Sequence, residues 1–253
     1  MRIYSEKAFV SAPSCVLLDL DNTLYDYAPC DTAGMNAARG VAQQLLNISS
    51  TDFNRCFADA RVEVKARLGS TGAAHNRLLY FQRTIERAGF ASQPFVGLQL
   101  EQAFWRAYLD AAVLFPSVQE FLDDLRIGGI PTVIVSDLTA QIQFRKLILL
   151  GLDRLVDWVV TSEESGRDKP DPASFELALA KIGGVEGIVW MIGDDIRRDL
   201  MGARQAIGAL TLQKLCPRSS PAAGAHEADA VFESFQEIRK MLRVLLENRG
   251  GRT

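Results

Sequence analysis

Two aspartates, Asp19 and Asp21, stand one residue apart directly after the apolar run Cys15–Leu18. An unbroken apolar run of this length is typical of a strand buried on both faces of a parallel sheet. The carboxyl ends of such strands form the edge at which ligands bind, so both carboxylates are expected there. Because two carboxylates this close repel each other, we expect a cation at this pair, with Thr23 fixing the turn that follows.

Three further polar residues supply the partners that a D-x-D sequence needs, because by itself it more often marks a strand ending in a solvated turn. The β-branched run Pro131–Val135 leads to Ser136, and the run Gly187–Ile192 leads through a glycine to Asp194. Lys169 opens the sequence K-P-D-P, in which the aspartate suits an N-cap and the second proline a first helical position. Since each residue follows a predicted strand, a parallel sheet would bring them to one edge.

The spacing of apolar residues divides the chain into two kinds of segment. From residue 31 to about 112 the pattern is helical, with breaks at glycine and proline, which predicts an all-helical insert. From residue 117 on, short strands alternate with helices, which predicts an α/β fold whose parallel sheet has helices on both faces. We predict a catalytic core from residues 1–25 and 114–253, and a helical cap from residues 26–113.

The element boundaries follow from the same patterns. The first 14 residues are expected to be an irregular lead-in, and the final helix opens with Ser234 and Glu237 in capping-box spacing. The expected cap helices are 31–46, 51–68, 73–88 and 98–112, and the expected later strands are 131–135, 156–160, 187–192, 209–212 and 230–232.

Composition limits the kinds of partner and compartment. The 253 residues are 48% hydrophobic and 23% charged with a net charge of -3, and no block of Lys and Arg is present. We therefore expect no nucleic-acid or membrane partner. The four cysteines lack metal-type spacing, and the sequence shows no export signal or long apolar run, so we expect a cytoplasmic protein.

The order of these motifs resembles that of the haloacid dehalogenase-like hydrolase superfamily, over about residues 15–232. The matching motifs are D-L-D-N-T, V-I-V-S, K-P-D-P and I-G-D-D-I-R-R-D. The resemblance implies a Rossmann-like core, and the insert after the first motif is similar to the helical type of cap. The stretch D-L-D-N-T-L-Y-D resembles the small-metabolite phosphatases of that superfamily.

The resemblance implies a role for each matching residue. Asp19 would be the nucleophile that takes up the phosphoryl group as an aspartyl-phosphate, which divides one difficult displacement into two easier ones. Asp21 would be the general acid for the leaving oxygen and then the base that activates water. Ser136 and Lys169 would hold the phosphoryl oxygens, and Lys169 would also offset carboxylate charge.

The resemblance also implies a bound Mg²⁺, with Asp19, the backbone carbonyl of Asp21 and Asp194 as its protein ligands. Mg²⁺ is a hard cation that takes a few carboxylates and retains several waters. Backbone groups at Leu20 and in the loop that begins at Asp137 are predicted to add contacts to the phosphoryl oxygens.

Three other residues have two interpretations each. Asp195 either contacts a metal-bound water or holds its own loop. Asp199 either orients Lys169 and waters near the metal or is a solvated acid in the first turn of a helix. Arg77, in the insert, either binds a carboxylate or second phosphate of the substrate or has a packing role.

The leading functional prediction is a Mg²⁺-dependent phosphatase of a small phosphorylated metabolite, such as a nucleotide, a sugar phosphate or a sugar-acid phosphate. A phosphosugar mutase using the same nucleophile is the alternative. A dehalogenase is disfavoured because that branch lacks the acid/base aspartate, which Asp21 supplies here. A non-catalytic binding protein is disfavoured because the whole set of catalytic residues is present. The sequence does not indicate an oligomeric state.

Overall fold

The computed structural model describes residues 1–5, 9–217 and 219–250, without the side chains of residues 249 and 250. Within these residues, no helix has both the length and the apolar character needed to cross a membrane.

The chain folds as two compact units. One, the core unit, combines Met1–Asp26 with Val113–Thr253, and the other, the helical cap, is Tyr27–Ala112. The cap is inserted between the first two parallel strands of the core sheet, β2 and β3. The expected all-helical insertion is therefore present.

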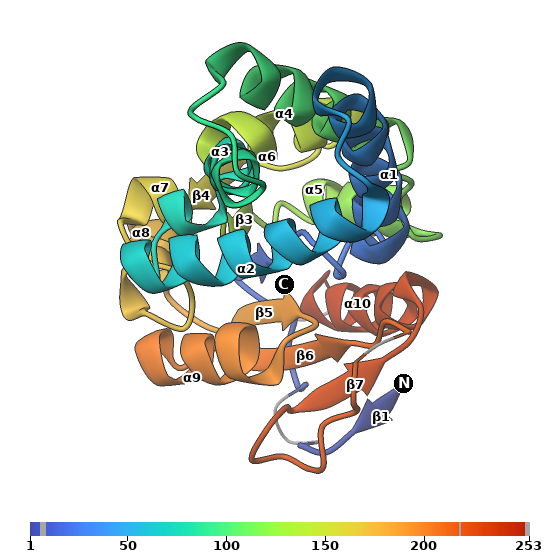
Figure 1. Cartoon of the computed structure of the whole chain (residues 1–253). Helices are drawn as coiled ribbons and strands as arrows, with labels where there is room; N and C mark the ends of the chain where they lie inside the picture. Colours follow the sequence, from blue (N-terminus) through green and yellow to red (C-terminus); the bar gives the residue numbers. More distant parts are fainter. Residues whose placement is uncertain (6–8, 218, 251–253) are drawn as a thin grey trace. The chain divides into compact units, whose positions relative to one another are not determined.

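The core unit contains a seven-stranded sheet with the order β1-β7-β6-β5-β2-β3-β4 (Figure 1). All neighbouring strands are parallel except β1 and β7, which pair antiparallel. This arrangement confirms the predicted α/β fold. Strand β1 lies in the predicted lead-in, where two residues are too few to show a strand pattern. The strands are β1 Arg2–Ile3, β2 Cys15–Leu18, β3 Thr132–Ser136, β4 Trp158–Thr161, β5 Val189–Gly193, β6 Leu210–Lys214 and β7 Ala230–Phe232.

Strand β2 lies at the point where the order of the sheet reverses. The chain continues from β2 to β3 and β4 on one side, and then to β5, β6 and β7 on the other. Leu18, the last residue of β2, pairs with Ile134 of β3 and Ile192 of β5. The residues that follow these three positions therefore lie at one edge, and such a reversal point is where open α/β sheets bind ligands.

Helices bury both faces of the sheet. Leu17, Val133 and Met191 pack in one buried cluster with residues of α8, η3 and α9. Ile134 points to the opposite face and is also fully buried. Outside that cluster, Phe121 of α5 and Phe235 of α10 pack with ring centroids 5.4 Å apart. The core helices are α5 Val118–Ile127, α6 Ala140–Leu149, α7 Ser162–Ser165, α8 Pro172–Lys181, η3 Ile196–Met201, α9 Gly202–Ile207 and α10 Phe235–Gly250.

The cap helices differ from the predicted ones mainly at three places. Helix α1 begins at Tyr27, four residues before the predicted start. Helix α4 begins at Pro94, four residues before the predicted start, because proline is accepted in the first turn of a helix. The third predicted helix is divided at Asn76, whose side chain caps α3 by accepting from the backbone of Leu78 and Leu79. The cap elements are α1 Tyr27–Leu46, α2 Ser50–Leu68, η2 Gly72–His75, α3 Arg77–Arg87 and α4 Pro94–Asp110.

A close approach of α1 and α4 in the cap depends on Gly34. A Cβ atom at Gly34 would lie 2.7 Å from the ring of Phe104 and 3.0 Å from its backbone oxygen. Phe104 is fully buried and packs against Phe81 and Trp105, so its ring has no free space to enter. Gly40, further along the same helix, has no atom within 4 Å of such a Cβ.

These two glycines provide a matched pair of variants. We expect Gly34→Ala to destabilise the protein by about 1–3 kcal/mol, because it forces an extra carbon into a packed interior. Gly40→Ala should stabilise it by up to about 1 kcal/mol, because alanine favours the helix and meets no neighbour. Thermal unfolding monitored by circular dichroism measures both, and shifts of the same sign would contradict the packing argument.

Candidate active site

Lys169 holds two carboxylates at the end of the central strands. Its Nζ atom donates to Asp19 Oδ1 at 2.6 Å and pairs with Asp199 Oδ1 at 2.7 Å. It also donates to the backbone carbonyl of Val135 at 2.8 Å, while the Thr23 hydroxyl donates to Asp19 Oδ2 at 2.8 Å. Burial by itself lowers the pKa of Lys169, but the surrounding carboxylates outweigh it and raise that pKa above its ordinary value. The lysine is therefore a fixed positive charge beside Asp19.

Asp194 completes an acidic cluster with Asp19 and Asp199, in which one oxygen of each lies within 4.8 Å of the others. Burial, together with the nearby carboxylates of Asp19 and Asp199, raises the pKa of Asp194 to about 8. Burial likewise raises the pKa of Asp199 to about 7, although Lys169 opposes that shift. The negative charge of this cluster is thus incompletely compensated by the protein groups around it.

The backbone next to Asp194 is closely packed against the cluster. A Cβ atom at Gly193 would lie 2.5 Å from both Cβ and Oδ2 of Asp199, so a larger residue would push these two acids apart. The backbone N–H of Asp195 donates to Asp199 Oδ2 at 3.1 Å. Glycine at this position therefore allows β5 and η3 to bring Asp194 and Asp199 together.

Asp21 lies outside the acidic cluster and has its own lysine. Lys146 Nζ donates to both of its carboxylate oxygens, at 2.7 and 2.8 Å. The Tyr25 hydroxyl also donates to Asp21, and Gln143 Nε2 approaches it at 3.4 Å. Burial would raise the pKa of Asp21, but Lys146, Tyr25 and Gln143 together lower it below its ordinary value. The repulsion expected between Asp19 and Asp21 is therefore relieved by two separate lysines.

Ser136 and Asp137 lie at the end of β3 in the same network. Gln143 Nε2 donates to Ser136 Oγ at 2.6 Å. Asp137 Oδ1 accepts the backbone N–H of Lys169 at 2.9 Å, and its other oxygen forms an ion pair with Arg198. Asp137 therefore holds the loop of Lys169, and its side chain is already engaged with protein groups.

Asp195 and Asp199, four residues apart, have different surroundings. Asp195 Oδ1 accepts the backbone N–H groups of Arg197 and Arg198, both at 2.9 Å, so it caps η3. Asp199 is 2% exposed and contacts Lys169. The interpretation of Asp199 as a solvated acid is therefore wrong.

Arg77 lies in the interior of the cap. Its guanidinium donates to the Tyr27 hydroxyl at 2.6 Å and lies 3.5 Å from Asp31 Oδ1. It also lies 5.2 Å from the ring centroid of Phe104 and 5.3 Å from that of Tyr80, within the range of cation–π attraction. These contacts hold the cap helices together, and a contact of Arg77 with substrate stays a prediction.

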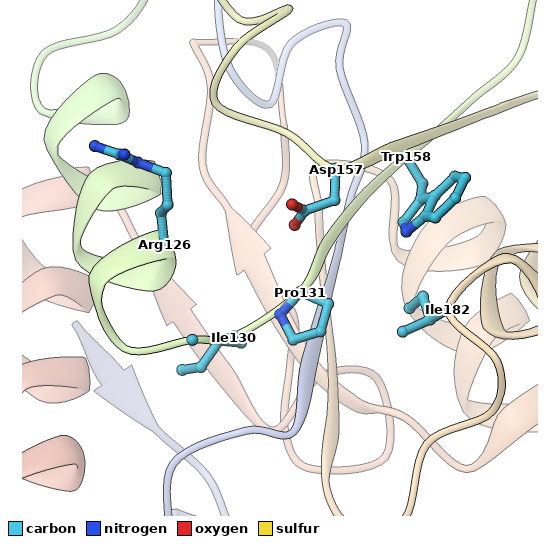
Figure 2. A pocket seen from close by; sticks show the side chains of 7 residues that line it. Arg126, Ile130, Pro131, Asp157, Trp158 and Ile182 are labelled. Carbon is cyan, nitrogen blue, oxygen red and sulfur yellow. The ribbon is translucent and has the colours of Figure 1, made fainter.

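A pocket of about 480 Å³ lies at the opposite edge of the sheet, where β3 and β4 begin (Figure 2). Asp157 in its lining is bound to the start of β3, because Oδ2 accepts the backbone N–H of Thr132 at 2.8 Å. None of the predicted catalytic residues lines this pocket, so it is not part of the acidic site. The lining residues are Arg126, Gly129, Ile130, Pro131, Asp157, Trp158 and Ile182.

Three residues that contact the predicted site were not predicted from the sequence, namely Tyr25, Gln143 and Lys146. Two of these carried a weak signal, because Gln143 and Lys146 are three residues apart on α6 and therefore share one helical face. Ile142 and Leu147 flank them on the buried side of the helix. Polar residues on an otherwise apolar face indicate a specific partner, but only the fold identifies that partner as Asp21.

Comparisons with known proteins identify the class of enzyme. Residues 13–206 match the family described as haloacid dehalogenase-like hydrolase. The chain is 41% identical over 200 residues to a ribulose-1,5-bisphosphate 5-phosphatase of Halopiger xanaduensis, covering 79% of this chain and 83% of that protein. The chain therefore belongs to the haloacid dehalogenase-like hydrolases. It is a phosphatase, a phosphoric monoester hydrolase, of that family.

More distant relatives extend the likeness over nearly the whole chain. A glyceraldehyde 3-phosphate phosphatase of Methanopyrus kandleri is 28% identical over 242 residues, covering 90% of this chain and 98% of that protein. A 2-haloacid dehalogenase structure from Pseudomonas syringae superposes with a TM-score of 0.72 at 21% identity, covering 91% of this chain and 98% of that one. A Bacillus subtilis HAD-hydrolase bound to magnesium superposes with a TM-score of 0.66 at 18% identity, covering 92% and 99%. At these identities, the two solved structures show that the fold is shared.

The different surroundings of Asp195 and Asp199 lead to a direct test. Asp195→Asn should leave kcat/KM within about threefold of the parent, because asparagine caps a helix as well as aspartate does. Asp199→Asn should lower kcat/KM by about 10²-fold, because Lys169 loses one of its two carboxylate partners and shifts beside Asp19. Steady-state phosphate release measures both, and an equal loss in the two variants would contradict this assignment.

Proposed function

We propose that this protein is a Mg²⁺-dependent phosphatase of a small sugar phosphate and that Asp19 is its nucleophile. The observation that carries the proposal is the acidic cluster of Asp19, Asp194 and Asp199 around one buried lysine, with a second carboxylate, Asp21, held apart from it. This separation gives the two aspartates of the first motif different partners, as two different chemical roles require.

The acidic cluster fits a magnesium ion. Its donors are carboxylate oxygens, the hard ligands that Mg²⁺ prefers. The raised pKa values of Asp194 and Asp199 indicate that the negative charge of the cluster is not fully balanced by protein cations. We propose Asp19, Asp194 and the backbone carbonyl of Asp21 as its protein ligands, with Asp199 acting through Lys169. Mg²⁺ bound there would neutralise part of the charge on the phosphoryl oxygens and on Asp19.

The proposed reaction has two displacements. In the first, a carboxylate oxygen of Asp19 forms a bond to phosphorus while the bond to the leaving oxygen breaks, and Asp21 gives that oxygen its proton. In the second, water loses a proton to Asp21 and attacks phosphorus, and the bond to Asp19 breaks. Phosphate is released, Asp19 regains its carboxylate, and Asp21 is again protonated for the next substrate.

The phosphoryl oxygens are expected to bind beside Lys169 and Ser136. Lys169 lies 2.6 Å from Asp19, so it can contact an oxygen of the transferring group without moving far. Ser136 ends the neighbouring strand, and Gln143 donates to its oxygen, which leaves the serine hydroxyl hydrogen to be donated. Backbone N–H groups at Leu20 and around Asp137 are proposed to supply further donors.

The relatives support a sugar phosphate as the substrate class. Two of them are named as phosphatases of ribulose-1,5-bisphosphate and of glyceraldehyde 3-phosphate. Both names describe short sugars that carry a phosphate on a terminal carbon. We therefore propose a phosphorylated sugar of this type as the substrate and the release of inorganic phosphate as the reaction.

A screen of phosphorylated metabolites tests the proposal. With Mg²⁺ present, we expect phosphate release to be fastest on sugar phosphates and sugar bisphosphates, without any bisphosphate activator. Addition of a chelator should reduce the rate to near zero, because the acidic cluster would lose its cation. Undiminished turnover with the chelator would remove the metal from the mechanism, and isomerisation in place of phosphate release would identify a mutase.

Replacement of the nucleophile is the second arm of this test. Asp19→Asn should lower kcat by about 10³-fold or more, because an amide oxygen cannot form the covalent intermediate. Asp157→Asn is a matched control, because Asp157 lies at the opposite edge of the sheet. Circular dichroism of both variants verifies folding, and full turnover by Asp19→Asn would refute its role as nucleophile.

A further inference from the structure

Helix α6 departs from the pattern expected for a helix packed on a sheet, because polar residues share its buried side and apolar residues lie on its exposed side. Its buried side includes Gln143, which is fully buried, and Lys146, which is 1% exposed. Its outer side exposes Phe144, Ile148 and Leu149, at 50%, 65% and 50%. A helix shaped by stability alone would bury its apolar residues and expose the polar ones. The arrangement therefore indicates that Gln143 and Lys146 have a specific task inside the core unit.

The task is visible in their contacts with Asp21. The ammonium of Lys146 lies against both carboxylate oxygens, so the carboxylate is held at two points. Gln143 Nε2 lies 3.4 Å from Asp21 Oδ2, 2.6 Å from Ser136 Oγ and 3.1 Å from the carbonyl of Asp137. The same amide thus joins the aspartate of the first motif to the serine of the second.

A buried ion pair of this kind is a poor means of gaining stability. Removing an ammonium from water costs several kcal/mol, and a well-packed apolar pair is often as stable or more so. Asp21 keeps 25% of its side chain exposed and also accepts from Tyr25, so Lys146 is not its only polar surrounding. What the pair provides is a fixed direction for the carboxylate.

We propose that Lys146, supported by Gln143, is a positioning residue that directs the Asp21 carboxylate toward the leaving oxygen of the substrate. This inference rests on the acid/base role proposed above for Asp21. Lys146 holds the carboxylate in one orientation, and Gln143 sets its distance from Ser136, which binds the phosphoryl group. Lys146 itself transfers no proton. Since proton transfer needs heavy atoms within about 3 Å, an Asp21 carboxyl group free to rotate would give its proton to the leaving oxygen less often.

The dependence of the rate on the leaving group tests this role. An alkyl phosphate such as glycerol phosphate needs protonation of its leaving oxygen, whereas p-nitrophenyl phosphate releases a stable anion without it. For Lys146→Met in the full chain, we expect kcat/KM on the alkyl phosphate to fall by about 10²-fold. The rate of the pre-steady-state burst of p-nitrophenol should stay within about threefold of the parent. The first displacement, which releases this product, does not depend on a proton from Asp21.

Two further variants control for general effects of the substitution. Arg145→Met removes a positive charge from the exposed side of the same helix and should change neither rate. Lys146→Gln keeps a hydrogen-bond donor of similar length without the charge, and it replaces Lys146→Met if that variant does not fold. An equal loss on both substrates, or no loss on the alkyl phosphate, would overturn the positioning role.

Asp21→Asn separates this inference from the proposed function. It should lower kcat/KM on the alkyl phosphate at least as much as Lys146→Met does, and it should also retain the p-nitrophenol burst. If Asp21→Asn keeps full activity on the alkyl phosphate, the acid/base role of Asp21 is refuted. If Asp21→Asn loses that activity while Lys146→Met keeps it, only the role of Lys146 is refuted.

Discussion

The contact of one buried ammonium, that of Lys169, with the carboxylates of Asp19 and Asp199 is the interaction on which the candidate active site depends. Each partner comes from a different part of the chain, and each would be costly to bury alone. Lys169, in the loop between α7 and α8, therefore requires the end of β2 and helix η3 to be in place together. Their common position explains why the acidic residues stay close enough to bind a cation.

The carboxylate of Asp21 is also costly to bury, and a different lysine compensates its charge. Asp19 and Asp21 are one residue apart, yet each has its own lysine, Lys169 from a loop and Lys146 from helix α6. Two separate cations offset the two neighbouring carboxyl groups without a shared counter-ion. They also place the two groups in different surroundings, as the two roles proposed for Asp19 and Asp21 require.

The fold of this protein is shared more widely than its chemistry. The dehalogenase and the magnesium-bound hydrolase share the fold at 21% and 18% identity, so the arrangement of the sheet and the insert tolerates large sequence change. The chemistry instead depends on a few side chains at one edge of that sheet, and fold and function are therefore separable. In this chain, the intact Asp21 and its contacts on α6 agree with phosphatase chemistry.

The sequence by itself determined the α/β class, the helical insertion and the positions of Asp19, Ser136, Lys169 and Asp194. Apolar runs that end in polar residues are a local signal, and parallel strands bring their ends together whatever lies between them. Only the tertiary structure decided the partners of Asp21, the buried state of Asp199 and the capping role of Asp195. Those outcomes depend on which helix packs beside which strand, because side chains that are far apart in the chain meet only after the sheet has formed.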